Sequence, residues 1–158
     1  MKTYKGAGVI GIKYNIKATI RDAVTNKVKR VYNFKNLLPT VGRTAIANNL
    51  ANTSPTPPSV LVNYCAVGTN ATAAANGDVQ LGTEVARNTI ASRTNSSNIA
   101  YITGFFAATE AVATLREVGF FINGTATVNS GTLLSRVIIN ITKSGTETLT
   151  LDLTLTIS

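Results

Sequence analysis

The side chains that could support acid–base chemistry are few and scattered along this chain. The sequence contains no histidine, the commonest general base in enzymes, and its single cysteine is Cys65. Of the seven acidic residues, Glu110 and Glu117 form a pair that is close in sequence. Two carboxylates can hydrolyse a glycosidic bond when the fold sets their separation, but no supporting motif accompanies this pair. We therefore expect structural carboxylates, a buried Cys65 and no enzymatic activity.

A glycine-rich motif at residues 6–11 (Gly-Ala-Gly-Val-Ile-Gly) matches the G-x-G-x-x-G pattern of dinucleotide sites. In those sites a strand precedes the glycines, and the amides of a following helix meet the pyrophosphate. Here only residues 1–5 precede the motif, and the pattern of a strand follows it. We therefore expect no cofactor. Without histidine and with one cysteine, we expect no metal site either.

Positive charge is concentrated at the N-terminal end of the chain. The formal net charge is +8, and residues 1–35 contain nine lysines and arginines against one aspartate. Residues 36–158 contain six basic and six acidic residues, so that part is neutral. This asymmetry predicts a basic N-terminal arm over residues 1–35 and a neutral body over residues 36–158.

The arm has the pattern of a β-hairpin. Apolar and polar residues alternate from Ile10 to Arg21, which is the period of a half-buried strand. A turn at 22–26 leads to a return strand at 27–34, in which we expect Val28, Tyr32 and Phe34 to point inward. The polar face should then carry a comb of basic side chains. These candidate partner-binding residues are Lys13, Lys17, Arg21, Lys27, Lys29 and Arg30.

Three roles fit a basic hairpin of this kind. It could dock on an acidic protein surface, where complementary charge sets orientation and association rate. It could lie on nucleic acid, with an affinity that falls as salt rises. It could also be a solvated edge whose lysines discourage unwanted strand pairing. Charge pattern alone leaves all three open, although Tyr14, Tyr32 and Phe34, which could stack on bases, belong to the apolar face.

The remainder of the chain predicts one short helix and many strands. Residues 37–50 have helical spacing with a start near Pro39 and Thr40, and the three prolines within 52–59 require a loop. From 149 to 157, leucines alternate with threonines, which predicts a strand at the centre of a sheet. The other expected strands cover 60–67, 85–94, 99–108, 114–122 and 133–141. The expected fold is mainly all-β: an antiparallel β-sandwich or jelly-roll-like barrel of about seven to nine strands.

No apolar run approaches the ~18 residues of a membrane span, so we expect no membrane partner. A carbohydrate-binding module is a further alternative, because sandwiches present sugar sites on loops. Exposed aromatics would be its hallmark, but the loops at 52–59 and 69–80 contain none.

Four pieces of the body resemble the tail-collar fibre proteins of tailed phages and related small virion proteins. They are residues 37–47 (LLPTVGRTAIA), residues 64–69 (YCAVGT) leading to 81–87 (LGTEVAR), residues 116–121 (REVGFF) and residues 131–136 (GTLLSR). The pieces occur in the order of that family and cover the body, residues 36–158. The resemblance implies a β-rich attachment module with no catalytic residue. The basic hairpin has no counterpart in the family pattern.

The resemblance and the charge pattern together predict a structural component of a tailed-phage virion. We expect it to dock on other virion proteins as a collar, neck, baseplate or fibre-attachment module, or as a capsid decoration protein. The expected partners are other virion proteins and further copies of itself, with a trimer favoured by analogy with fibres. The particle would assemble in the cytoplasm of the bacterial host. The alternatives are a basic nucleic-acid-binding protein and the carbohydrate-binding module.

Overall fold

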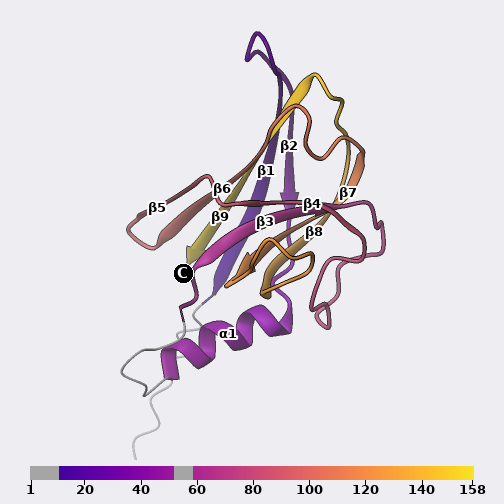
Figure 1. The fold of residues 1–158 in the computed structure, drawn as a ribbon. Coiled ribbons are helices and arrows are strands. Elements are labelled where there is room, and N and C mark those ends of the chain that lie inside the picture. Colours follow the sequence, from indigo (N-terminus) through magenta and orange to yellow (C-terminus); the bar gives the residue numbers. More distant parts are fainter. Residues whose placement is uncertain (1–10, 52–58) are drawn as a thin grey trace, which may run out of the picture.

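The structure is a computed structural model that describes residues 11–51 and 59–158 (Figure 1). Two antiparallel β-sheets pack against each other within these residues and one short helix adjoins them, so the expected mainly β sandwich is confirmed. The glycines Gly6 and Gly8 of the N-terminal motif lie outside the described residues, as does the proline-rich stretch 52–58.

The described residues form nine strands and one helix, and every pair of neighbouring strands is antiparallel. One sheet has the order β2-β1-β9-β6-β5 and the other the order β4-β3-β7-β8. The five strands of the first are β1 (Ile12–Asp22), β2 (Val28–Lys35), β5 (Ser92–Ser96), β6 (Ile99–Phe106) and β9 (Glu147–Ile157). The second contains β3 (Val62–Gly68), β4 (Glu84–Thr89), β7 (Thr114–Ile122) and β8 (Thr132–Thr142). Helix α1 spans Thr40–Ala51.

The C-terminal strand β9 lies at the centre of the five-stranded sheet, between β1 and β6, as its leucine alternation predicts. Leu149, Leu151 and Leu153 are fully buried, while the threonines between them face outward. Pairing with β1 runs without a bulge along the whole strand, from Ile12 opposite Ile157 to the hairpin end. The two ends of the described chain are therefore joined in one sheet.

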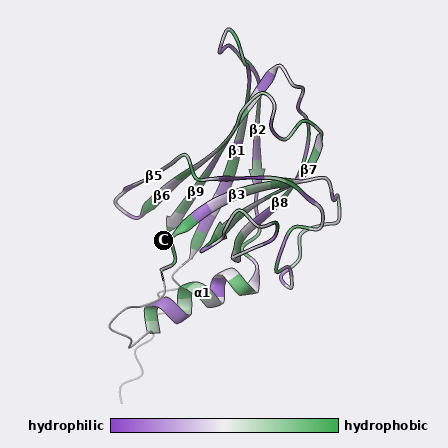
Figure 2. Ribbon diagram, viewed as in Figure 1, coloured by the Kyte–Doolittle hydropathy of each residue, from purple (hydrophilic) through white to green (hydrophobic). Residues whose placement is uncertain are grey.

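The basic hairpin belongs to the same core as the body. Ile16, Ala18 and Ile20 of β1 are fully buried between the sheets, and hydrophilic and hydrophobic residues alternate along the strand (Figure 2). The change in charge at residue 35 therefore does not coincide with a break in packing. Tyr32 and Phe34 of β2 pack against this core as expected, with their rings stacked.

Two details of the expected strands are wrong. Val28 points outward, with 49% of its surface exposed, because a bulge at Ile20 and Arg21 shifts the register at the start of β2. The expected strand at 85–94 is two strands, β4 and β5, which belong to different sheets. The chain crosses between the sheets at Ile90 and Ala91, whose amides bond to β3 and β6 respectively.

Helix α1 packs on β8 at one end of the sandwich, where Ala45 and Ile46 contact the main core (Figure 1). A Cβ atom added to Gly42 would lie 2.8 Å from the Leu134 carbonyl oxygen, so glycine permits the close approach of helix and strand. Leu50, which has the spacing of the packed face, is instead 83% exposed near the helix end. Over residues 11–51 and 59–158, no helix has the length and apolarity that a membrane crossing requires.

The buried hairpin residues provide a test of this shared core. We expect Ile16→Ala to lower the free energy of unfolding by about 2–5 kcal/mol, because it removes buried methyl groups and leaves a cavity. Urea denaturation measures this change. The matched control is Val24→Ala at the hairpin tip, where 93% exposure predicts a change within about 0.5 kcal/mol. Equal stability of the two variants would mean that the hairpin is not part of the core.

Candidate functional site

Lys13 and Lys17 project from the outer face of the five-stranded sheet, as the alternation along β1 predicts. Ile16 between them points the other way into the core. Both lysines are exposed, and neither side chain has a hydrogen bond or ion pair to another described residue. Lys35 of β2 extends the same face, since it lies opposite Asn15, and it is also exposed and unpaired. The candidates chosen from the sequence omit Lys35.

The tip of the hairpin is a rigid turn with two of the candidate residues. The Asp22 carboxylate accepts the Val24 amide at 3.2 Å, and Asn26 adopts a left-handed backbone with φ of 57°. Arg21 donates from Nη1 to the Asn26 carbonyl oxygen at 3.0 Å, so its guanidinium braces the turn. The Lys27 side chain is exposed and bonds to no described residue, and Val24 of the same turn is 93% exposed. Figure 1 shows this tip at the end of the sandwich opposite to α1.

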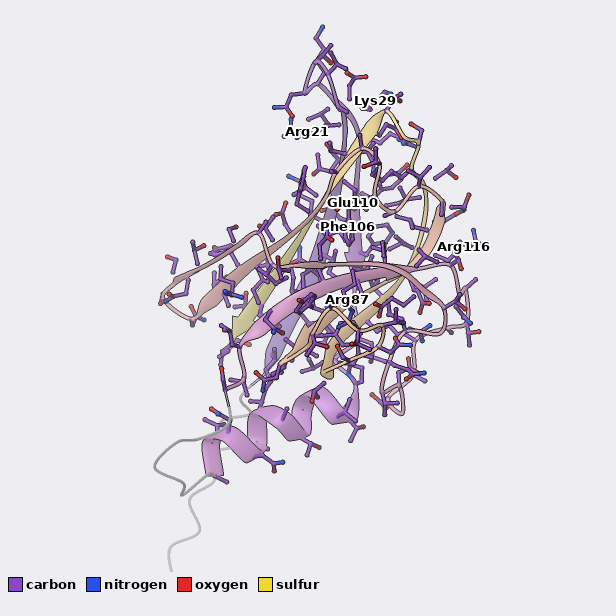
Figure 3. The ribbon with its side chains drawn as sticks, viewed as in Figure 1. Arg21, Lys29, Arg87, Phe106, Glu110 and Arg116 are labelled. Atoms are coloured by element: carbon purple, nitrogen blue, oxygen red, sulfur yellow. The ribbon has the colours of Figure 1, made fainter. Side chains whose placement is uncertain are left out.

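Lys29 and Arg30 both bind the carboxylate of Glu147 at the start of β9. The distance from Arg30 Nη2 to Glu147 Oε2 is 2.8 Å, and that from Lys29 Nζ to Oε1 is 3.2 Å. Lys29 lies near the hairpin end in Figure 3. Burial raises the pKa of Glu147, but the Ser144 amide and the two cations outweigh it, so the pKa lies below its usual value. These two candidate residues tie the start of β2 to the body through ion pairs.

All the carboxylates of the chain have partners within the molecule. The sequence has seven acidic side chains, all within the described residues. Each accepts at least one hydrogen bond or forms an ion pair. They are Asp22, Asp78, Glu84, Glu110, Glu117, Glu147 and Asp152. The hairpin lysines with no such partner are Lys13, Lys17, Lys27 and Lys35. The described lysines without a partner therefore all lie on the hairpin, whereas Arg43, Arg93 and Arg116 of the body bond to neutral oxygens.

A buried ion-pair network occupies the other face of the four-stranded sheet. Arg136 of β8 is 3% exposed and lies between two carboxylates. Its Nη1 is 2.6 Å from Asp78 Oδ2, and its Nη2 is 2.9 Å from Oε2 of the fully buried Glu117. Glu117 also accepts the amides of Gly82 and Thr83, at 3.0 and 2.8 Å. The network therefore fixes the loop at 69–83 against the sheet.

A second arginine, Arg87 of β4, completes this polar layer (Figure 3). It forms a two-point pair with Glu84, with Nε–Oε1 of 2.7 Å and Nη2–Oε2 of 3.0 Å. Its guanidinium carbon lies 4.4 Å from the centre of the Phe121 ring, and Nη1 donates to the Ser130 carbonyl oxygen at 3.0 Å. Arg87 thus joins β4 to the loop between β7 and β8.

Four stretches of the chain, residues 37–47, 64–87, 116–121 and 131–136, meet at this layer. Leu37 of the first stretch exchanges two backbone hydrogen bonds with Arg136 of the fourth. Gly68 and Glu84 belong to the second stretch, and a Cβ atom on Gly68 would lie 2.5 Å from Oε1 of Glu117 in the third. Leu37, Gly68, Glu84, Glu117 and Arg136 thus build the scaffold of the fold.

Two exposed aromatic residues, which sequence reasoning did not select, lie on the same sheet face as the free lysines. Tyr101 and Phe105 of β6 are each 41% exposed, whereas Ile102 and Phe106 point into the core. The alternation at 99–106 does separate these pairs, but it does not indicate which side faces solvent. The burial of Ile102 and Phe106 against β9 and the opposite sheet decides that.

A cavity of about 530 Å³ lies between the sheets at the α1 end of the sandwich. Its lining is mainly apolar and includes Ile12, Ile46, Val62, Ile102, Leu134 and Leu155. The polar groups at its border, Arg93 and Asn98, bond to backbone carbonyl oxygens. These residues form no acid–base pair.

The remaining side chains that could be reactive, Cys65 and Lys143, have structural roles. Cys65 is fully buried, as expected, and desolvation raises the pKa of its thiol. Lys143 is 1% exposed, and its ammonium donates to the carbonyl oxygens of Ala107, Ala108 and Glu110 at 2.8–2.9 Å. Desolvation lowers the pKa of Lys143. In the described part of the chain, no three His, Cys, Asp or Glu side chains are grouped to hold a metal ion.

Comparison with protein-family models, with curated proteins and with solved structures finds no match to this chain. The resemblance to tail-collar fibre proteins therefore stays a prediction from the four sequence pieces.

The buried network predicts a large loss of stability in Glu117→Gln. Removing one partner of a buried ion pair costs about 3–5 kcal/mol, and we expect the lower end because Asp78 still pairs with Arg136. Thermal and urea unfolding measure the change. Asp152→Asn, on the outer sheet face, is the matched control and should change stability by no more than about 0.5 kcal/mol. A neutral effect of Glu117→Gln would contradict this role.

The lowered pKa of Glu147 predicts how the hairpin attachment depends on pH. A carboxylate whose folded pKa lies below its unfolded value of 4.5 stabilises the fold above that pH and loses this effect as pH falls through the folded pKa. We expect the stability difference between wild type and Glu147→Gln to be constant above about pH 5 and to shrink below pH 4.5. Unfolding measured from pH 3 to 7 tests this. A difference that grows on acidification would reverse the assigned sign.

Proposed function

We propose that this protein is a structural component of a tailed-bacteriophage virion and docks on other virion proteins through its basic hairpin. The virion assignment is supported by the four sequence pieces similar to tail-collar fibre proteins, which occur in the family order. Their residues meet in the buried polar layer around Glu117 and Arg136. The particle would be assembled in the cytoplasm of the bacterial host, with this chain at the collar, neck or baseplate, or as a capsid decoration.

The observation that carries the docking proposal is the segregation of unpaired charge. Every acidic side chain has a partner inside the molecule, while Lys13, Lys17, Lys27 and Lys35 are exposed on the hairpin and their side chains bond to none of the residues 11–51 and 59–158. A surface of this kind attracts and orients an acidic partner surface. The hairpin is also well suited to present charge rigidly, because Glu147 holds the start of β2 through Lys29 and Arg30.

The same charge distribution constrains the proposed homo-oligomer. Two hairpins placed against each other would bring unpaired lysines together, and like charges at an interface oppose association. A trimer, favoured by analogy with fibres, would therefore use surfaces other than the hairpin. The lysines then remain available for a different virion protein.

Electron microscopy of virions with and without this gene product tests the assignment. Density lost from the capsid lattice would identify a decoration protein, and density lost from the neck or tail would identify a collar or baseplate component. Unchanged particles would overturn the virion assignment.

We expect the double variant Lys13→Glu/Lys17→Glu to bind virions lacking the wild-type protein at least about tenfold more weakly at ~0.1 M salt, mainly through slower association. Both side chains are exposed, so folding should be preserved. Arg43→Glu/Arg116→Glu, with the same change in net charge, is the control, since α1 lies at the opposite end of the sandwich (Figure 1) and Arg116 lies on β7 of the other sheet (Figure 3). Co-sedimentation with particles measures the binding. Equal loss in both variants would mean that net charge, not the hairpin, determines docking.

A further inference from the structure

We infer that the docking surface continues from the hairpin across the outer face of the five-stranded sheet, with Tyr101 and Phe105 as its aromatic anchors. The occupant is an acidic protein that also presents an apolar patch to these two rings. This inference rests on the proposed docking function and assigns it a footprint and a partner chemistry.

The strand register places the aromatic and basic residues on one continuous surface. Tyr101 lies opposite Thr154 of β9, which lies opposite Asn15 of β1, which lies opposite Lys35 of β2. Adjacent strands are about 4.8 Å apart, so the rings and the hairpin lysines are separated by roughly 14 Å across the sheet. One partner surface can cover both.

A second row of residues gives this surface an apolar margin. Phe105 lies opposite Thr150, which lies opposite Thr19, which lies opposite Val31 of β2. Val31 is 46% exposed. Thr150 and Thr154 of β9 offer methyl and hydroxyl groups without charge on either side of Asp152, whereas Thr19 of β1 is buried.

This arrangement has the anatomy of a protein–protein interface. Such interfaces are depleted of charge at the centre, enriched in aromatic anchors and surrounded by a charged rim. Here Tyr101 and Phe105 are the exposed aromatics of the described residues, Thr150 and Thr154 of β9 flank the one carboxylate of Asp152 at the centre, and Lys13, Lys17 and Lys35 supply positive charge on the hairpin side.

Asp152 favours a protein partner over single-stranded nucleic acid. It lies in the middle of the face, opposite Lys17 on one side and Thr103 on the other, and it accepts a hydrogen bond from the Thr103 hydroxyl at 2.8 Å. A phosphate backbone that stacked its bases on Tyr101 and reached Lys17 would pass over this carboxylate and be repelled. An acidic protein surface can place its carboxylates over the lysine rim alone.

The test uses the full-length protein and particles purified from a phage lacking this gene product. Wild type should bind these particles, and Tyr101→Ser/Phe105→Ser should bind at least tenfold more weakly with an unchanged dependence on salt. Lys13→Glu/Lys17→Glu should instead reduce the salt dependence. Val79→Ser/Val128→Ser, at loop residues that are 56% and 60% exposed, is the control and should bind as wild type does. Thermal melting checks that each variant is folded.

The outcomes separate the two proposals. Wild-type affinity in the aromatic variant, with loss in the lysine variant, would overturn the aromatic footprint and leave hairpin docking intact. Failure of the wild-type protein to bind the particles would overturn the docking function itself. A third arm titrates a 20-nucleotide oligothymidylate. Tight binding at 0.15 M salt that is lost in the aromatic variant would replace the protein partner with nucleic acid.

Discussion

The pairing of Glu117 with Arg136 is the interaction on which the rest of this structure depends. Both side chains are buried on the face of the four-stranded sheet that would otherwise be open to solvent. Arg136 recruits Asp78, and Glu117 accepts two amides, so the loop at 69–83 is fixed over the sheet. With the loop in place, Leu81 can be buried against Phe121 in a second apolar cluster. A mainly β protein thus gains a third layer from an ionic pair.

The buried network also explains why the exterior is so strongly basic. Arg136 forms ion pairs with Asp78 and Glu117, and Arg87 forms one with Glu84. Glu147 forms ion pairs with Lys29 and Arg30. The acidic groups therefore bind partners within the molecule, and no carboxylate forms an ion pair with Lys13, Lys17, Lys27 or Lys35 within the described residues. Because the acidic side chains bind arginines and the lysine and arginine at the start of β2, the other hairpin lysines are left on the surface without an ion pair to a described residue.

The hairpin both packs into the common core and exposes lysines to solvent. The inward face of β1 contributes Ile16 and Ile20 to the common core, while its outward face presents Lys13 and Lys17. A surface built on a central strand keeps its geometry when a partner binds, because the strand cannot move without disturbing the core. This rigidity distinguishes it from a basic tail, which would have to be ordered on binding.

Sequence periodicity by itself determined the mainly β class, the central position of the C-terminal strand, the hairpin with outward Lys13 and Lys17, and the burial of Cys65. These properties are local, because alternation assigns each side chain to one of two faces. Only the tertiary structure decided that Lys29 and Arg30 bind Glu147, that residues 85–94 divide between two sheets, and that Tyr101 rather than Ile102 faces outward. Each of these depends on residues far away in the chain, and a single sequence contains no signal for such pairings.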